Sequence, residues 1–379
     1  MTSVVQYSYD LVGNRTQLVD NGVTVNYTLG TGNKLASWGI NGQQQFDAAG
    51  NVTNLQDDSG RQLSMTWDSR YRLTSVATNG TPAESYGYDA LGRRISISDG
   101  STTSYLVYDG VQVIAETDSS GNLLKSYTYG PGIDNILSMT VHGSTTSTYY
   151  YVKDHLGSVQ AVVDASGTVV ESYQYDAWGN TSVFDGAGNP LQASAIGNSF
   201  CWQGREYSWK TGLYYFRARW YDPVTARWLS NDPIGISGGL NQYVFCANAP
   251  VMFRDPWGTS REDVGNIVDI FYQIVIWMEE SGYRPPSDGS MWNNFTGFFG
   301  LTDYWGCDQQ ARTLLSSLLG VGNWDNPWGF SQQGKILLLP HQWVVATPSI
   351  PSDPIIILDP WKGTVQVIPQ DKPKKKICP

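Results

Sequence analysis

Three residues in the last third of the chain have the types and the order of a nucleophilic triad. They are Cys307, His341 and Asp359. A cysteine thiol attacks a carbonyl carbon after an imidazole takes its proton, and a carboxylate orients that imidazole. Asp353 is a competing third member, although it precedes Pro354 and Asp-Pro is typical of a turn. The pattern therefore predicts a cysteine hydrolase that acts on a carbonyl or carboxamide carbon.

The elements around these residues must bring the three side chains together. Cys307 opens a stretch with helical spacing, and the N-terminus of a helix lowers the pKa of a thiol. His341 opens the apolar stretch 341–346, and Asp359 ends the next one, 354–359. Both stretches have the composition of strands. If they are neighbouring antiparallel strands, His341 lies beside Asp359.

This order of motifs resembles the papain-like and transglutaminase-like cysteine enzymes, and most closely the papain-fold toxin domains of polymorphic toxins. The resemblance covers about residues 292–367 and implies a small α+β domain. It implies glutamine deamidation or crosslinking, which we favour, or peptide cleavage; the sequence does not separate them. Papain has a Gln before its cysteine as oxyanion donor, and here Trp305, Asn293, Asn294 or the Cys307 amide would serve.

A second feature is the junction segment, residues 231–258, which separates two parts of different composition. Asp-Pro-x-Gly units at 232–235 and 255–258 bracket it. Proline restricts φ and glycine tolerates positive φ, so both units are typical of tight turns. The apolar residues 243–245 between them are predicted to form a short strand.

An aromatic-aspartate pair recurs through the part that precedes the junction segment. Gly-Asn or Gly-Arg follows several copies, and Gly-Asn is a hairpin signal because both residues accept positive φ. The copies are Tyr9-Asp10, Phe46-Asp47, Trp67-Asp68, Tyr88-Asp89, Tyr108-Asp109 and Tyr175-Asp176. Repetition of this kind indicates one supersecondary unit copied along an axis. We therefore predict a series of hairpins in a first domain, 1–258, and a different domain over 259–379.

The repeats and the junction segment together resemble the C-terminal part of the Rhs/YD-repeat core. The resemblance rests on both DPxG units, on residues 239–243 and 248–250 between them, and on the run 212–222 before them. It covers residues 5–258 and implies a β-rich shell fragment, a spiral antiparallel β-sheet, that encloses a variable C-terminal toxin. Because the family's shell is several times longer, we expect either a larger shell or a partner that supplies the remainder.

The same resemblance implies that the chain cuts itself. In that family the aspartates of the signature are implicated in the cut, which here are Asp232 and Asp255, with the cut near Gly258. A pair of this kind needs one carboxyl group that holds a proton and one that activates water. The family usually has Leu after the second DPxG, whereas this chain has Thr259. The alternative is that both aspartates only cap turns.

Composition limits the partners. The net charge of −10 and the pI near 4.7 argue against a nucleic-acid partner and disfavour a nuclease payload. The four cysteines lack the paired spacing of a zinc site, and no metal or cofactor is indicated. No Sec signal and no apolar stretch of roughly 18 residues is evident, so we expect no membrane span.

The resemblance therefore implies secretion by a dedicated machine, such as type VI secretion in interbacterial competition, with a payload that acts in the target-cell cytosol. A target-cell protein and a cognate immunity protein would be its partners. The competing hypothesis is a carbohydrate-binding surface protein, in which exposed Trp and Tyr contact ligands and Cys307 is unreactive.

Overall fold

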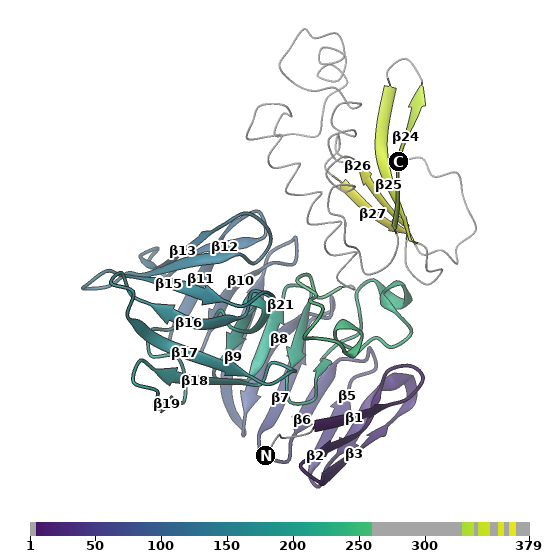
Figure 1. Cartoon of the computed structure of the whole chain (residues 1–379), viewed down its shortest axis with the longest axis horizontal. Helices are drawn as coiled ribbons and strands as arrows, with labels where there is room; N and C mark the ends of the chain where they lie inside the picture. The colour runs from purple at the N-terminus through teal and green to yellow at the C-terminus, as the bar shows by residue number, and fades with distance from the viewer. Residues whose placement is uncertain (1–4, 260–327, 337–339, 349–354, 360–363, 369–379) are drawn as a thin grey trace. The chain divides into compact units, whose positions relative to one another are not determined.

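The structure, a computed structural model, describes residues 5–259, 328–336, 340–348, 355–359 and 364–368 (Figure 1). Residues up to Thr259, other than 237–239, form one compact unit, and the described strands after residue 327 belong to a second. Each unit is described by itself. Within the described residues, no helix is both long and apolar enough to cross a membrane.

The first unit contains a 19-stranded sheet in which each strand pairs antiparallel with the next. The β-rich antiparallel fold predicted from the sequence is therefore confirmed. Its strands are β1 (Val5–Tyr9), β2 (Arg15–Asp20), β3 (Val23–Leu29), β4 (Leu35–Trp38), β5 (Gly42–Phe46), β6 (Val52–Gln56), β7 (Gln62–Trp67), β8 (Leu73–Thr78), β9 (Thr81–Tyr88), β10 (Arg94–Ser98), β11 (Thr103–Asp109), β12 (Gln112–Thr117), β13 (Leu123–Tyr129), β14 (Ile136–Val141), β15 (Ser147–Lys153), β16 (Val159–Val163), β17 (Val169–Tyr175), β18 (Thr181–Asp185) and β19 (Pro190–Leu191).

In five of the six repeats, all but the one at Asp109, the aspartate side chain builds the hairpin turn that follows it. In the turn between β9 and β10, the N–H of Arg93 donates to Asp89 Oδ1 at 2.9 Å, and Nε of Arg93 donates to Asp89 Oδ2 at 2.8 Å. Where the repeat has Gly-Asn, the glycine alone takes positive φ, 90° at Gly50. Asn51 instead donates its Nδ2 to Asp47 Oδ2 at 2.8 Å. The hairpins are as predicted, but the role expected for the asparagine was wrong.

In four of the repeats, those at Trp67, Tyr88, Tyr108 and Tyr175, the aromatic residue donates a hydrogen bond to an earlier strand. Tyr88 donates its hydroxyl to the carbonyl of Leu73 at 2.8 Å, and Tyr175 donates to that of Val159 at 2.6 Å. Indole Nε1 of Trp67 does the same at Val52, 2.7 Å away. The pair therefore has two functions. The aspartate closes a turn, and the aromatic donor gives a backbone carbonyl of the neighbouring strand its hydrogen bond, since a buried carbonyl without a partner is costly.

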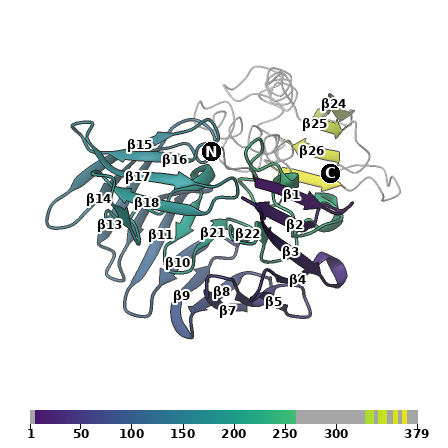
Figure 2. The same ribbon diagram turned by 60° about the horizontal axis from the view of Figure 1, so that its bottom comes forward.

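A small second sheet packs inside the large one. Its strands are β20 (Glu206–Ser208), β21 (Leu213–Phe216), β22 (Arg219–Asp222) and β23 (Arg227–Trp228). Figures 1 and 2 show β21 at the centre of this unit, with β16–β18 on one side and β1–β5 on the other. Alternate residues of a strand point to opposite faces. Accordingly, the sheet has a hydrophobic core on each side. Leu213 and Tyr215 belong to the first core, which they share with β4–β9. Tyr214 and Phe216 belong to the second core, which they share with β11–β18.

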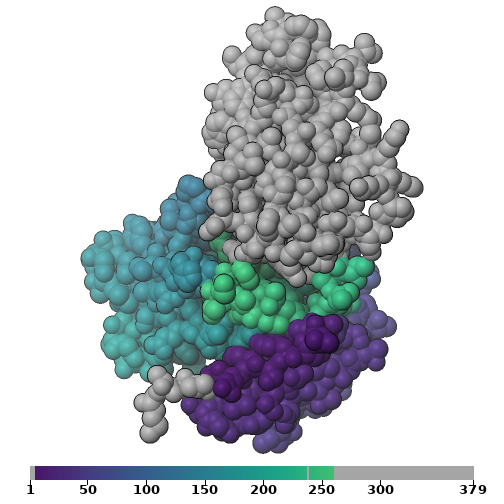
Figure 3. Space-filling view, turned by 45° about the vertical axis from the view of Figure 1, so that its right-hand side comes forward, coloured from purple at the N-terminus to yellow at the C-terminus, as the bar shows by residue number. Residues whose placement is uncertain are grey.

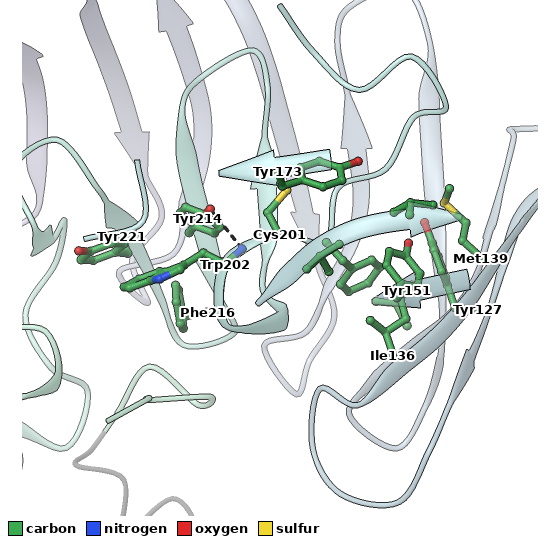
Figure 4. Packing of buried hydrophobic residues seen from close by; sticks show 14 of the residues in the cluster. Tyr127, Ile136, Met139, Tyr151, Tyr173, Cys201, Trp202, Tyr214, Phe216 and Tyr221 are labelled. Carbon is green, nitrogen blue, oxygen red and sulfur yellow. Dashed lines mark hydrogen bonds between the residues drawn. The ribbon is translucent and has the colours of Figure 1, made fainter. Parts of the chain in front are cut away.

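The second core consists mainly of aromatic side chains. Trp202 stacks on Tyr221 with ring centroids 5.7 Å apart, and its backbone N–H lies 3.3 Å from the Tyr214 hydroxyl (Figure 4). Phe245, from the junction segment, lies 4.4 Å from Tyr221 between centroids. The junction segment is thereby anchored in the core of the shell.

The strand predicted over residues 243–245 was wrong. Only Val244 forms a bridge, to Arg227 of β23. Residues 246–248 then take left-handed conformations, with φ between 45° and 64°, which an extended strand does not allow.

Beyond residue 327, the described residues form a four-stranded antiparallel sheet. It contains β24 (Trp328–Ile336), β25 (Pro340–Pro348), β26 (Ile355–Asp359) and β27 (Thr364–Ile368). The two strands predicted from the sequence correspond to β25 and β26, which are antiparallel neighbours. The helix predicted to begin at Cys307 lies outside the described residues.

Candidate functional site

The two signature aspartates lie on either side of one buried arginine. Nη2 of Arg219, the first residue of β22, is 2.9 Å from Asp232 Oδ2 and 3.3 Å from Asp255 Oδ2. The three side chains are only 3%, 5% and 2% exposed. The guanidinium carbon of Arg219 also lies 4.1 Å from the ring centre of Trp228. The two carboxylates are therefore brought together on one charged group away from water.

Burial changes the proton affinity of this cluster. It raises the pKa of Asp232 to about 6, because removal from water outweighs the attraction of Arg219, and the Asp255 charge adds to the rise. Burial also lowers the pKa of the Arg219 guanidinium, although both aspartates oppose that change. Asp232 is thus the carboxyl group that keeps its proton into the mildly acidic range.

Each aspartate also caps its own turn. Asp232 Oδ1 accepts the N–H of Ile234 at 3.0 Å. Asp255 Oδ1 accepts the N–H of Gly258 at 2.9 Å and that of Thr259 at 3.2 Å. The turn-capping alternative describes these contacts correctly, but caps alone do not require both carboxylates to share a buried guanidinium.

The turn that joins β21 to β22 binds the backbone of the second DPxG unit. Arg217 Nη1 donates to the carbonyl of Pro256. The N–H of Ala218 donates to the carbonyl of Trp257 at 3.2 Å. Arg219 Nε donates to the carbonyl of Gly258. We call residues 217–219 the carbonyl-binding turn. Three successive residues therefore hold three successive carbonyl groups.

Hydrogen bonds to the N-terminal hairpins and to Gln203, which precedes β20, hold the junction segment in place. Towards the N-terminal hairpins, Asn241 Nδ2 lies 2.6 Å from Asn14 Oδ1, and Asn248 Nδ2 donates to the Gly13 carbonyl at 2.8 Å. Towards the later strands, Gln203 Nε2 donates to the Pro250 carbonyl at 3.0 Å. In Figure 3 the green segment that ends at residue 259 lies between the purple N-terminal hairpins and the teal strands.

A second buried ion cluster supports the carbonyl-binding turn. Asp134, in the turn before β14, contacts Arg205 Nη1 at 2.7 Å and Arg217 Nη2 at 2.6 Å through the same Oδ1. The guanidinium of Arg217 lies 5.1 Å from the ring centre of Trp257. Asp134 therefore fixes the arginine that binds the Pro256 carbonyl.

The predicted triad is described only in part. His341 is in β25 and Asp359 ends β26. The two strands are antiparallel neighbours, in which Val344 pairs with Leu358. Cys307 lies outside the described residues, and the triad remains a prediction.

The candidate oxyanion donors and the competing acid also lie outside the described residues. They are Trp305, Asn293, Asn294 and Asp353.

Sequence reasoning missed the two arginines of the carbonyl-binding turn. Arg217 and Arg219 belong to the run 212–222 that carried the family resemblance, but no role was assigned to them. Their signal was the presence of two cations in an otherwise aromatic, buried pair of strands, since buried charges are rare without partners.

A sheet built from aromatic-aspartate hairpins, with a buried Arg219–Asp232–Asp255 cluster at its last segment, defines a YD-repeat shell protein. The model of the family described as Teneurin YD-shell matches residues 2–251. The chain belongs to this family.

Similar proteins include several with toxin or nuclease names. The tRNA3(Ser)-specific nuclease WapA of Bacillus spizizenii is 36% identical over 68% of this chain and 11% of that protein. The double-stranded DNA deaminase toxin A of Burkholderia cenocepacia is 28% identical over 67% of this chain and 19% of that protein. The toxin protein Tse5 of Pseudomonas aeruginosa is 28% identical over 56% of this chain and 18% of that protein. This chain thus spans a tenth to a fifth of the length of these relatives.

Among solved structures, the crystal structure of TcdB2-TccC3-TEV matches 68% of this chain and 17% of its own, at 20% identity and a TM-score of 0.41.

Proposed function

We propose that this chain is part of a polymorphic toxin whose YD-repeat shell, residues 1–258, carries a C-terminal enzyme and releases it by cutting itself. The observation that carries this proposal is the buried arginine shared by Asp232 and Asp255, directly beside the Gly258 peptide. An acid and a base that face one peptide can hydrolyse it. Asp232 holds the proton, and Asp255, whose oxygens accept hydrogen bonds, serves as the base.

The relatives support a carrier with exchangeable cargo. WapA is named as a tRNA nuclease and the Burkholderia protein as a DNA deaminase toxin, yet each matches this chain over more than half its length. A shared shell with different enzymes accounts for both facts. The cargo of this chain is therefore inferred from its own residues.

The cargo, residues 259–379, is a cysteine hydrolase of the papain or transglutaminase type. Cys307 attacks a glutamine side chain or a peptide carbonyl of a target-cell protein, His341 takes the thiol proton and Asp359 orients the imidazole. An immunity protein would protect the producing cell, and a dedicated secretion machine would deliver the toxin to the target-cell cytosol. The antiparallel pairing of the strand that contains His341 with the strand that ends at Asp359 supports this assignment.

Intact-mass spectrometry of the purified chain tests the release step. The wild-type protein should give two fragments that meet near Gly258, and Asp232→Asn and Asp255→Asn should remain whole. Asp99→Asn is the control, because it alters an aspartate ion pair with Lys210 at the surface. An uncut wild-type chain, or aspartate variants that cut as fast as the wild type, would contradict self-release by this chain.

For the carbohydrate-binding alternative, the shell residues that the structure describes expose tyrosines, namely Tyr9, Tyr71, Tyr105 and Tyr150, but no tryptophans. None of the tryptophans in residues 5–259 is exposed; each is buried or partly buried. The part of the chain that the structure describes therefore offers no exposed indole on which a sugar could stack.

A further inference from the structure

We propose that the first hairpin, β1–β2, controls when the chain cuts itself, because the junction segment closes only against the folded turn at residues 10–14. This inference rests on the proposed self-cleavage and adds its regulation. The cut waits until the first and the last parts of the shell have met.

Asn14 is the centre of a buried network that joins the first hairpin to the junction segment. Its side chain is almost fully enclosed, since the residue is only 1% exposed. Its Nδ2 donates to Asp10 Oδ2 and to Asn33 Oδ1, both at 2.9 Å. Its Oδ1 accepts from Arg227 Nη1 at 3.2 Å and from Asn241 Nδ2 at 2.6 Å. An asparagine amide can make no more hydrogen bonds than these. We call Asn14 and these four partners the asparagine hub.

Arg227, the first residue of β23, depends on the hub for its partners. It is buried, and its guanidinium donates to the Asn14 amide oxygen and to the Asn33 carbonyl rather than to a carboxylate. Burial lowers the pKa of this guanidinium to about 10. Because a buried cation is costly unless its donors are satisfied, Arg227 is stable in this position only when the N-terminal turns are already in place.

A second N-terminal turn, at residues 47–51, supports the same segment. The Tyr243 hydroxyl donates to the Gly50 carbonyl at 2.7 Å, and Asn231 Nδ2 donates to the Ala49 carbonyl at 2.7 Å. The partners in these two bonds are 193 and 182 residues apart in the sequence. Contacts this distant form late in folding, since a long loop must close first.

The residue after the hub connects it to the cutting site. Gln242 follows Asn241, and its carbonyl accepts from Arg219 Nη1 at 3.2 Å. Its Nε2 donates to the carbonyl of Gly235, in the first DPxG unit, at 3.2 Å. Both signature aspartates contact the same arginine. Loss of the hub therefore removes support from the segment that carries both aspartates to Arg219.

The order of synthesis gives this arrangement its consequence. The first hairpin is made long before the junction segment, and N-terminal parts of a chain generally fold first. The last part of the shell then closes onto the first part. A chain whose sheet has not yet bent far enough to bring the two together cannot complete the cutting site. The cargo therefore stays covalently attached until the shell is assembled.

The experiment compares variants of the whole chain, synthesised in a cell-free system and sampled over time by intact mass. Asn14→Ala removes the centre of the hub, and Asn241→Ala removes its partner in the junction segment but leaves the first hairpin unchanged. Asn122→Ala is the matched control. Asn122 closes its own turn by the same bond, from Nδ2 to Asp118 Oδ2 at 2.8 Å, but is exposed and has no contact with the junction segment in the described structure.

Each substitution is also placed in an Asp232→Asn background, which keeps the chain whole. Thermal melting then measures the stability lost, and hydrogen exchange followed by mass spectrometry measures the protection of residues 231–258. These two measurements separate a local loss of the junction segment from a general loss of folding.

Asn14→Ala and Asn241→Ala should each cut at least about tenfold more slowly than the wild type, and Asn122→Ala should cut at nearly the wild-type rate. The double variant should be less impaired than two independent losses predict, because both residues act through one contact. In the uncut background, only the hub variants should lose protection over residues 231–258.

Hub variants that cut as fast as Asn122→Ala, or that cut slowly while residues 231–258 keep their protection, would overturn the inference and leave self-release standing. A wild-type chain that is not cut at all would contradict both.

Discussion

Arg219 and Asp232 form a buried ion pair, with Nη2 of the arginine 2.9 Å from Oδ2 of the aspartate and only 3% and 5% of the side chains exposed. Burying charges costs several kcal/mol, and apolar side chains of similar size often stabilise a fold as well or better. Here one cation also faces a second carboxylate, Asp255. Two carboxyl groups buried on one guanidinium are poorly explained by stability alone, which favours a chemical role.

The first prediction is that self-cleavage depends on pH through Asp232. Burial raises the pKa of this carboxyl group to about 6. Of the two charged groups that face it, Arg219 lowers the pKa and Asp255 raises it. If Asp232 must hold a proton, the rate should be high below pH 6. It should fall by up to about tenfold per pH unit above that value.

Rates can be measured by transferring freshly synthesised chain into buffers between pH 5 and 8 and following the two fragments by mass. Thermal melting at each pH serves as the control for folding. A rate that is constant or rises over this range would contradict the role of Asp232 as the acid.

The second prediction compares the glycines of the two DPxG units. Both take positive φ, 64° at Gly235 and 68° at Gly258. A Cβ at Gly235 would meet nothing within 4 Å, whereas one at Gly258 would overlap the Phe216 carbonyl. Alanine at either site pays the left-handed conformational cost of roughly 1–2 kcal/mol, but only Gly258→Ala also displaces the peptide to be cut.

Gly235→Ala should therefore retain cleavage with a small loss of thermal stability, and Gly258→Ala should cut at least about 100-fold more slowly. Equal cleavage rates in the two variants would show that the close approach at Gly258 has no part in the reaction.

Much of the shell could be predicted because its signals are local. Aspartate followed by glycine within a few residues specifies a turn, and the turn between β9 and β10 forms through contacts within residues 89–93. The aromatic spacing likewise indicated that hairpins repeat. What the sequence did not indicate was that Tyr88 donates to Leu73 in an earlier strand.

The site was predicted less completely because it depends on contacts between distant segments. Asp232 and Asp255 were identified from the DPxG units, but Arg219 was not. No local sequence pattern indicates which buried strand contacts both turns. The strand predicted over residues 243–245 failed for a related reason. The left-handed φ values at Cys246 and Ala247 are unusual for residues other than glycine and asparagine.

The third prediction concerns the ion cluster that supports the carbonyl-binding turn. Burial opposes ionisation of Asp134, but Arg205 and Arg217 outweigh it and lower its pKa. Asp134→Ala would leave two buried guanidinium groups without this carboxylate. In an Asp232→Asn background, which keeps the chain whole, we expect the free energy of unfolding to fall by about 3–5 kcal/mol.

Urea unfolding measures this loss, and Asp99→Ala at the surface is its control. Since the folded pKa of Asp134 lies below the unfolded value of 3.8, its contribution is present above that pH and is lost on further acidification. Asp134→Ala should therefore be less sensitive to acid than its parent. A loss below about 1 kcal/mol would show that the two arginines do not depend on Asp134.

The fourth prediction tests the cargo through the reactivity of its cysteine. A thiol paired with an imidazole, or placed at a helix N-terminus, ionises at lower pH than a free thiol, so iodoacetamide near pH 6 should label Cys307. Cys201 is the internal control, because it is buried and its burial raises the pKa of the thiol well above the ordinary value. His341→Ala should reduce labelling of Cys307 by about tenfold or more without exposing Cys201.

Peptide mapping separates the two sites, and Cys307→Ala should remove toxicity when residues 259–379 are expressed in cells. Labelling that is unaffected by His341→Ala would remove the imidazole from the triad, and toxicity that survives Cys307→Ala would end the cysteine hydrolase proposal while leaving the self-cleaving shell intact.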